Sequence, residues 1–276
     1  MGYFSSIGTF GDVSAEQDDA VLSYFLKTEA VDRIASGDVL LVLGRKGAGK
    51  TALTKYFSTA RGKDLSIALS LRDYPWNLHA QRRNLGASDI ESYVSSWRYL
   101  IAVKAASLIV TCQKARASTD AFTALNKFLI ENYGAADARL GDILRPNGIR
   151  LSKGSIAPSI MGNALGGIEF EAKTGAVPPE LDALTDAILD AVLTCANQSG
   201  VEEIFVHFDG LDQGLSTFDA RRKEMIIGLI LAARSISSQR VGDARIAPVI
   251  YLRTDLWEAL TSRIGRLVSH LNWTSR

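Results

Sequence analysis

The sequence predicts an α/β protein in which a mostly parallel sheet is covered by helices on both faces. Three observations support this fold class. Short apolar runs of strand length alternate along the chain with longer segments of helical period. The first apolar run, residues 39–43, passes through a glycine-rich turn directly into a helical pattern. A later run, residues 204–208, ends in Asp209, at the strand end where open α/β sheets bind their ligands.

Each element follows from its local pattern. Apolar runs predict five strands, at residues 39–44, 65–71, 203–209, 246–253 and 267–273. Helical periods predict helices over residues 14–36, from about 50 to 57, and over 88–114, 119–133, 178–198, 217–237 and 256–264. Residues 134–176 are rich in Gly, Ala and Ser without a helical period, and residues 149–152 and 168–171 are candidates for a local hairpin.

The glycine-rich turn matches the pattern G-x-x-x-x-G-K-[ST] at residues 44–51. Glycines let the backbone bend so that successive N–H groups face phosphate oxygens, and the N-terminus of the following helix adds its positive dipole end. We therefore predict that Lys50 contacts the β- and γ-phosphates of a nucleotide and that the Thr51 hydroxyl holds Mg²⁺. The alternative is a turn that joins strand and helix without a ligand. The predicted phosphate-binding residues are Gly44, Arg45, Lys46, Gly47, Ala48, Gly49, Lys50, Thr51 and Ala52.

Polar residues at the ends of two later strands complete the predicted site. Asp209 is predicted as a second Mg²⁺ ligand, directly or through water, and Asp212 as the group that polarises the attacking water. An ordinary loop acid or a helix cap is the alternative for Asp212. Arg253 ends the fourth strand and is the candidate that senses the γ-phosphate, with a salt bridge to Asp255 as the alternative.

Composition and charge narrow the classes of function. The net charge of +1 gives no general attraction to nucleic acid or to acidic membranes. No apolar run approaches the ~20 residues that span a bilayer, and the N-terminus lacks the pattern of a secretory signal. Cys112 and Cys195 lie in apolar helical patterns, which predicts buried thiols in a reducing compartment and hence a cytoplasmic protein. The sequence has no guanine-recognition signature, so ATP is the expected nucleotide.

Residues 8–53, with "SSWRYLI", "FDGLDQG", "YLRTDLW" and the closing "LNW", resemble the bacterial FunZ-type P-loop ATPases. These proteins are related to AAA-type initiator ATPases and more loosely to the KAP and STAND groups. The resemblance implies a three-layer αβα P-loop NTPase fold of the additional-strand (ASCE) group, with the sheet order 5-1-4-3-2. It also implies a role in a bacterial defence or DNA-associated system.

The resemblance covers nearly the whole chain and implies one ATPase domain over residues 1–276. Residues 38–74 and 200–276 would form the nucleotide-binding core. Because the two nucleotide motifs are far apart in the sequence, we expect residues 75–199 to be a mainly helical insertion between strands 2 and 3 with a layer of its own. The resemblance leads us to expect a chain without the small helical C-terminal lid of the wider AAA pattern, either as a short variant, as a truncated chain or with a partner that supplies the lid. The apolar underside near Trp257 and Trp273 would then be open to a partner.

Three other positions bear on the resemblance. Gly210 stands where many relatives carry a second acid, which moves the activation of water onto Asp212. Arg240 and Arg245 precede the fourth strand, where related ATPases sometimes present an arginine to a neighbouring subunit. In this chain we expect both to be solvated loop charges.

The expected function is that of an ATP hydrolase: a Mg²⁺-dependent nucleotide switch with slow turnover, read by a protein partner or a homo-oligomer. Two alternatives remain from other classes. One is a nucleic-acid-associated, initiator-like ATPase, which the net charge does not support. The other is a non-catalytic nucleotide-binding scaffold, which the missing lid favours. No membrane partner is expected.

Overall fold

The computed structural model confirms an α/β fold with a mostly parallel sheet. It describes residues 18, 21–23, 25–58, 64–71, 74, 76, 89–112, 120–144, 149–151, 156, 168–170, 180–211, 219–264 and 273–275. Within this part, the main sheet has the order β2-β5-β7-β1-β8, with parallel pairing throughout, and β6 pairs with β7 in the antiparallel sense. Its strands are β1 (Leu41–Gly44), β2 (Leu65–Ser70), β5 (Glu203–Asp209), β6 (Arg240–Val241), β7 (Ala244–Arg253) and β8 (Trp273–Ser275).

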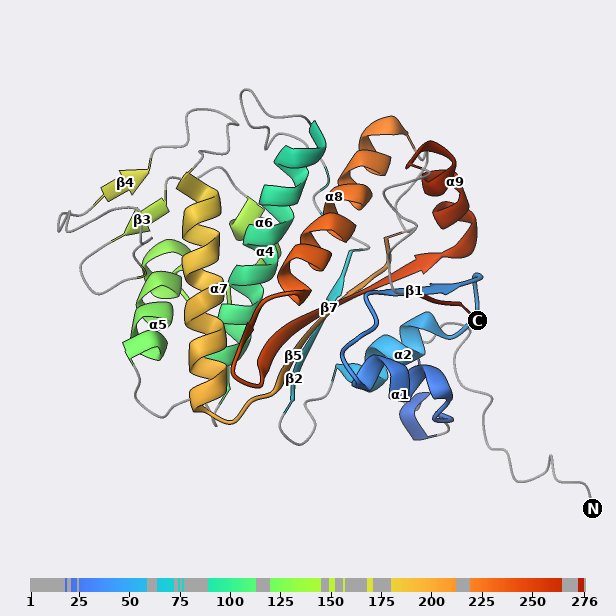
Figure 1. Ribbon diagram of the computed structural model, residues 1–276, viewed down its shortest axis with the longest axis horizontal. Helices are drawn as coiled ribbons and strands as arrows, with labels where there is room; N and C mark the ends of the chain where they lie inside the picture. The colour runs from blue at the N-terminus through green and yellow to red at the C-terminus, as the bar shows by residue number, and fades with distance from the viewer. Residues whose placement is uncertain are drawn as a thin grey trace, which may run out of the picture.

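Helices cover both faces of this sheet (Figure 1). Helices α1 and α2 lie on one face, whereas α4 and α8 lie on the other and α7 and α5 pack against α4. No helix among the described residues is both long and apolar enough to cross a bilayer. The helices are η2 (Val21–Ser23), α1 (Glu29–Ala35), α2 (Lys50–Phe57), α4 (Asp89–Thr111), α5 (Asp120–Tyr133), α6 (Leu140–Leu144), α7 (Glu180–Gln198), α8 (Ala220–Ser237) and α9 (Thr254–Ile264).

The near-continuous apolar strands are explained by burial on both faces. Side chains of a strand alternate between its two faces, so each strand supplies both cores. In β1, Leu41 and Leu43 join the large core around α4 and α8, whereas Val42 joins the smaller core around α1 and α2. In β5, Phe205 faces the smaller core and Phe208 the larger one. This alternation determines which side chains of each strand lie on the side of α2.

The N-terminal helical period is divided in the structure. We expected one helix over residues 14–36, but among the described residues of that segment only η2 and α1 are helical. Thr28 precedes α1 with extended backbone angles, φ −120° and ψ 166°, which break the helix. Phe25, just before this break, stacks on Tyr56 of α2 with ring centroids 4.6 Å apart. The apolar residues before and after Thr28 therefore reach the core without forming one continuous helix.

Between β2 and β5 the described residues form the helices α4, α5, α6 and α7 and a short hairpin. Its strands are β3 (Ile149–Leu151) and β4 (Ile168–Phe170), which pair in the antiparallel sense. However, α4 does not lie in a separate layer, because it packs directly on β2, β5 and α8. A Cβ atom on Gly228 of α8 would lie 2.6 Å from Tyr93 Cβ, so α4 and α8 cross at a distance that only glycine allows.

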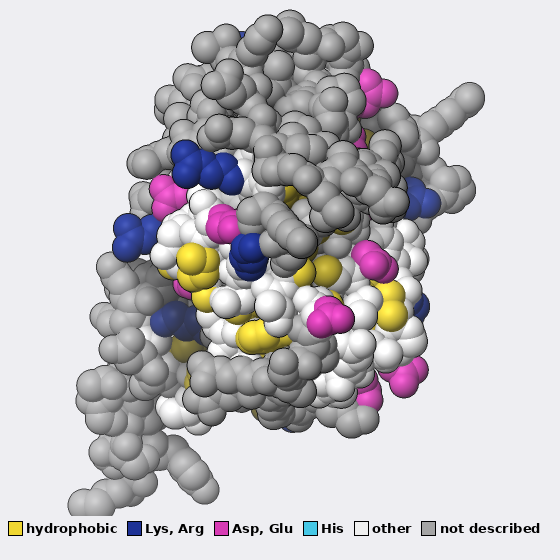
Figure 2. Space-filling view, turned by 90° about the vertical axis from the view of Figure 1, so that its left-hand side faces the viewer, with side chains coloured by type: hydrophobic (Ala, Val, Ile, Leu, Met, Phe, Trp, Pro, Cys, Tyr) yellow, Lys and Arg dark blue, Asp and Glu magenta, His cyan; other side chains and the backbone are white. Residues whose placement is uncertain are grey.

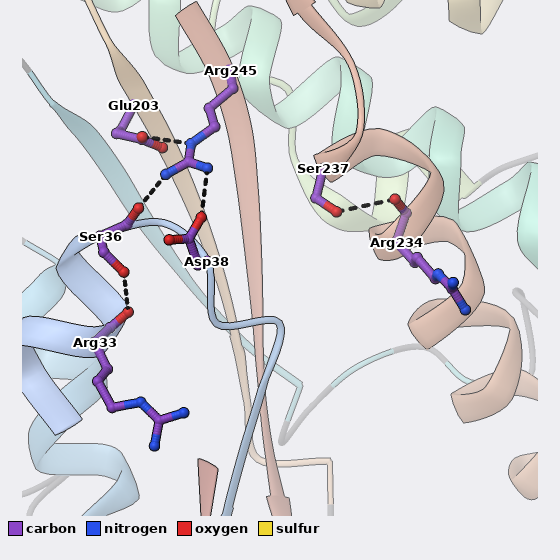
Figure 3. Close-up of polar contacts among 7 residues, drawn as sticks. All are labelled: Arg33, Ser36, Asp38, Glu203, Arg234, Ser237 and Arg245. Atoms are coloured by element: carbon purple, nitrogen blue, oxygen red, sulfur yellow. Dashed lines mark hydrogen bonds and ion pairs between the residues drawn. The ribbon is translucent and has the colours of Figure 1, made fainter. Parts of the chain in front are cut away.

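A buried arginine joins the amino ends of two strands to the chain before β1 (Figure 3). The Arg245 guanidinium donates to Glu203 at 2.5 Å, to Asp38 at 3.0 Å and to the backbone carbonyl of Ser36. A Cβ atom on Gly37, which has φ +70°, would overlap this guanidinium. The expectation that Arg245 is a solvated loop charge is therefore wrong: it lies in β7, and its side chain is 9% exposed. Arg240 is exposed in the short strand β6.

We predict that Arg245→Met lowers the free energy of unfolding by about 2–4 kcal/mol, measured by urea denaturation, because it leaves Glu203 without its cation. Burial already raises the pKa of Glu203, while Arg245 acts in the opposite direction. A carboxyl group with a raised pKa binds its proton more tightly in the folded state than in the unfolded state. At low pH Glu203 is therefore neutral in a larger share of the folded variant, and the absence of its cation costs less stability. The loss should therefore be smaller at about pH 5 than at about pH 8.

Arg234→Met is the matched control, because Arg234 is exposed on α8 and its side chain points away from the cluster in Figure 3. Its effect should stay within about 0.5 kcal/mol. Equal losses in the two variants would show that Arg245 contributes no more than a surface arginine.

Candidate functional site

The glycine-rich turn follows β1 at the carboxyl edge of the sheet. Gly47 and Gly49 have φ of +81° and +82°, the left-handed region that favours glycine, and neither would meet an atom within 4 Å if it carried a Cβ. Gly44 is different, because its Cβ would lie 3.2 Å from Ala48 Cβ. A side chain at position 44 would thus crowd Ala48, whereas the space beside Gly47 and Gly49 is free of protein atoms among the described residues.

Lys50 begins α2 and reaches back over the turn. Its Nζ atom donates to the backbone carbonyls of Gly44 at 3.0 Å and Arg45 at 3.1 Å. The N-cap of α2 is Gly49, so no side chain caps the first N–H groups of the helix. Backbone N–H groups at a helix start beside a lysine ammonium favour an anion. Thr51 follows in the first turn and is half-buried.

The other predicted loop residues complete this turn. Arg45 and Lys46 are exposed, and the Ala48 N–H donates to the Arg45 carbonyl at 3.1 Å. Ala52 is half-buried in the first turn of α2. The turn therefore leaves two further cations at the surface beside Lys50.

Asp209 ends β5 at the same edge of the sheet. Alternation along β5 places Asp209 on the face of Phe205 and His207, which is the face covered by α2. Its Oδ1 atom accepts from the Gly210 N–H at 2.8 Å. Gly210 has φ +76°, so an acid at that position would be strained, which gives a physical reason for glycine there. Asp212 lies outside the described residues.

Arg253 lies beside the loop but is paired with an acid. In the sheet register it stands next to Gly44. Its guanidinium donates to both carboxylate oxygens of Asp255, from Nε at 2.9 Å and from Nη2 at 2.5 Å. This hydrogen bond is the main reason that the pKa of Asp255 is lowered. The salt bridge foreseen as the alternative for Arg253 is therefore present.

A buried polar cluster under α2 was not predicted. The Tyr251 hydroxyl in β7 lies 3.1 Å from His207 Nδ1, and nearby the Thr54 hydroxyl in α2 donates to the backbone carbonyl of Lys50 at 3.1 Å. Burial lowers the pKa of His207 to about 3, and burial, followed by the charge of Asp209, raises the pKa of Tyr251. The signal in the sequence was a histidine and a tyrosine inside two apolar strands, where we treated all residues as core.

The oxygen donors at this edge fit Mg²⁺ only together with a ligand that brings more oxygens. Among the described residues, no group of three or more His, Cys, Asp or Glu side chains could hold a metal ion alone. Thr51 and Asp209 offer one hydroxyl and one carboxylate: Thr51 lies in α2, and Asp209 ends β5 on the face of the sheet that α2 covers. Mg²⁺ is commonly held by one or two such groups plus substrate phosphates.

We expected an open apolar surface near Trp257 and Trp273, and the structure describes the first of these side chains. Trp257 in α9 is partly buried and packs against the large core, so it is not an open surface residue. The side chain of Trp273 lies outside the described residues.

Comparisons with protein-family models, curated proteins and solved structures found no match to this chain.

We predict that Asp255→Asn strengthens the binding of inorganic tripolyphosphate to the loop about 2- to 5-fold in titration calorimetry, because it loosens the hold on Arg253. Glu258→Gln is the matched control, since Glu258 is an exposed acid in the same helix and the change removes the same charge. An equal gain in both variants would mean that only net charge matters and that Arg253 does not reach the anion.

Proposed function

We propose that this chain is a Mg²⁺-dependent ATP-binding P-loop ATPase of the ASCE group that acts as a nucleotide switch with slow hydrolysis. The observation that carries the proposal is the turn after β1: an open glycine backbone, the first turn of α2, and Lys50 lying across it. This arrangement suits a chain of phosphates better than any other ligand class, because it offers consecutive N–H donors and a fixed cation to oxygen atoms.

The sheet order supports the same proposal. If β1, β2, β5, β7 and β8 are numbered 1 to 5 in chain order, the order across the sheet is 5-1-4-3-2. That is the order that the resemblance to FunZ-type ATPases implies. In this order β7 lies between β1 and β5, so the loop after β1 and the acid after β5 are two strand spacings apart, about 10 Å.

The residues divide the work in the following way. Lys50 binds the β- and γ-phosphates, and the loop N–H groups orient them. Thr51 and Asp209 hold Mg²⁺, which neutralises charge on the phosphates when it is bound. Asp212 orients and polarises the attacking water. Arg253, once released from Asp255, contacts the γ-phosphate and so reports its presence to β7 and α9.

A nucleic-acid-associated role has less support. Figure 2 shows the face of the molecule at the left of Figure 1, and among the residues described on that face Lys and Arg side chains are interspersed with Asp and Glu. A nucleic-acid footprint requires a concentrated basic stripe. We therefore propose a protein partner or a second copy of the chain as the reader of the nucleotide state, in the cytoplasm of a bacterial cell.

We predict that Lys50→Ala lowers ATP affinity at least 10-fold in titration calorimetry and abolishes turnover, because the ammonium contributes charge-assisted contacts to the phosphates. Lys127→Ala in α5 removes the same charge far from the loop and should change neither quantity. Unchanged ATP affinity in the Lys50 variant, with the fold intact by circular dichroism, would contradict the phosphate-loop assignment.

We predict that Asp209→Asn keeps ATP binding without Mg²⁺ but loses the gain in affinity that Mg²⁺ provides, together with hydrolysis, because a full charge is removed beside the metal. Asp212→Asn should retain that gain and slow turnover only. The comparison is made by calorimetry with and without Mg²⁺ and by phosphate release. Parental turnover in the Asp212 variant would rule it out as the water-orienting group.

A further inference from the structure

A cavity of about 240 Å³ lies between the sheet and the two helices α1 and α2, on the face that these helices cover in Figure 1. The strands contribute Ser66 of β2 and Phe205 of β5, which are neighbours in the sheet register. The helices contribute Val31 of α1 and Tyr56 and Phe57 of α2. Packed protein interiors leave few voids larger than a water molecule, so a cavity of this size needs an explanation.

This cavity is separate from the proposed nucleotide site. The register pairs Ser66 with Phe205, and it pairs Ser70 with Asp209 four residues later. Four residues of a strand span about 13 Å, so the cavity lies that far from Asp209 along the strands. Lys50 begins α2, whereas the residues of α2 at the cavity are the last two of the helix. A ligand in the cavity would therefore bind toward the amino edge of the sheet, away from the phosphate loop.

The charged side chains around the cavity favour a cation. Three ionisable groups line it: Lys27 and Asp32, which are exposed, and Asp64, which is half-buried. Among the described residues no cation pairs with Asp64, and its electrostatic neighbour is another acid, Glu202. Burial, followed by the charge of Glu202, raises the pKa of Asp64. Both effects disfavour the ionised carboxylate, and a bound cation would offset them.

The rest of the lining restricts the kind of cation. The three aromatic side chains form an apolar wall that suits a ring or an alkyl chain, and aromatic faces attract organic cations. Ser66 Oγ is buried without a hydrogen-bond partner among the described residues, a cost that a ligand donor would remove. Among these residues no group of three or more His, Cys, Asp or Glu could hold a metal ion. The volume lies below the ~300–1,000 Å³ of pockets for drug-sized ligands, so the cation is small.

We propose that this cavity binds a small organic monocation, an ammonium group on a body of one ring or a short alkyl chain. The ammonium group pairs with the Asp64 carboxylate and donates to Ser66 Oγ, while the body packs against the aromatic side chains of α2 and β5. Lys27 opposes a second positive charge on the ligand and so limits it to one. The ligand contacts the end of the helix that Lys50 begins, without touching the phosphate loop.

The test compares three probes of similar size that differ in charge: phenethylammonium, neutral 2-phenylethanol and anionic 3-phenylpropionate. Each is titrated into the full chain without nucleotide, and binding is followed by amide chemical shifts in two-dimensional NMR. Phenethylammonium should bind with a dissociation constant of about 1 mM, and the alcohol and the carboxylate at least about 5-fold more weakly. The largest shifts should fall in residues 64–66, in Phe205 and at the ends of α1 and α2, rather than in residues 44–51.

Two variants separate the charge of the cavity from its shape. Asp64→Asn should weaken phenethylammonium about 5- to 10-fold and the alcohol less than about 2-fold, because only the cation loses a charge-assisted contact. Asp190→Asn is the matched control, since Asp190 is an exposed acid of α7 and the change removes the same charge; it should alter neither affinity. Ser66→Ile fills the cavity and should abolish binding of both probes. If Ser66→Ile does not fold, the comparison of Asp64→Asn with Asp190→Asn decides.

Several outcomes would overturn the cation site. They are no binding of phenethylammonium, equal affinity for the three probes, tighter binding of the carboxylate, and equal losses in Asp64→Asn and Asp190→Asn. Shifts confined to residues 44–51 would place the probe at the phosphate loop and would overturn it too. Because no nucleotide enters the experiment, these outcomes are independent of whether the chain binds or hydrolyses ATP.

Discussion

The parallel alignment of β1, β5 and β7 is the constraint on which the rest of the structure depends. Because these strands run in the same direction, Gly44, Asp209 and Arg253 all fall at one edge of the sheet, although they are far apart in the sequence. Parallel pairing in turn requires helices on both faces, since each strand is apolar on both sides. The two cores thus hold the strands in register and thereby place the site residues.

Strand β7 lies between β1 and β5 and carries polar contacts near both its amino and its carboxyl end. It pairs with both β1 and β5, and its first nine residues are buried. At its amino end Arg245 binds Glu203 and the segment before β1, and near its carboxyl end the Tyr251 hydroxyl lies 3.1 Å from His207 Nδ1 of β5. Polar side chains therefore tie β7 to β5 near both ends and to the segment before β1 at its amino end, while apolar packing occupies the middle.

The sequence predicted the local features well and the long-range contacts of polar side chains poorly. The strand, the glycine turn and the start of α2 were predictable, because each depends on a few adjacent residues and on backbone angles that glycine alone adopts easily. Arg245 was misjudged because its partners, Glu203 and Ser36, come from other parts of the chain. No role was predicted for His207 and Tyr251 for the same reason: a polar residue in an apolar strand reveals its partner only after the strands are paired.

The pairing of β1 has a consequence for how the protein is made. Leu41 of β1 pairs with Ile250 on one side and with Trp273 on the other, and β2 pairs with β5 across the whole helical segment. During synthesis, β1 and β2 leave the ribosome long before their partners exist, with open strand edges and apolar faces on both sides. The helices α4, α5 and α7 can pack meanwhile, but β1 must wait for β7. The glycine turn, among the early segments to be translated, is therefore among the last to take its folded form.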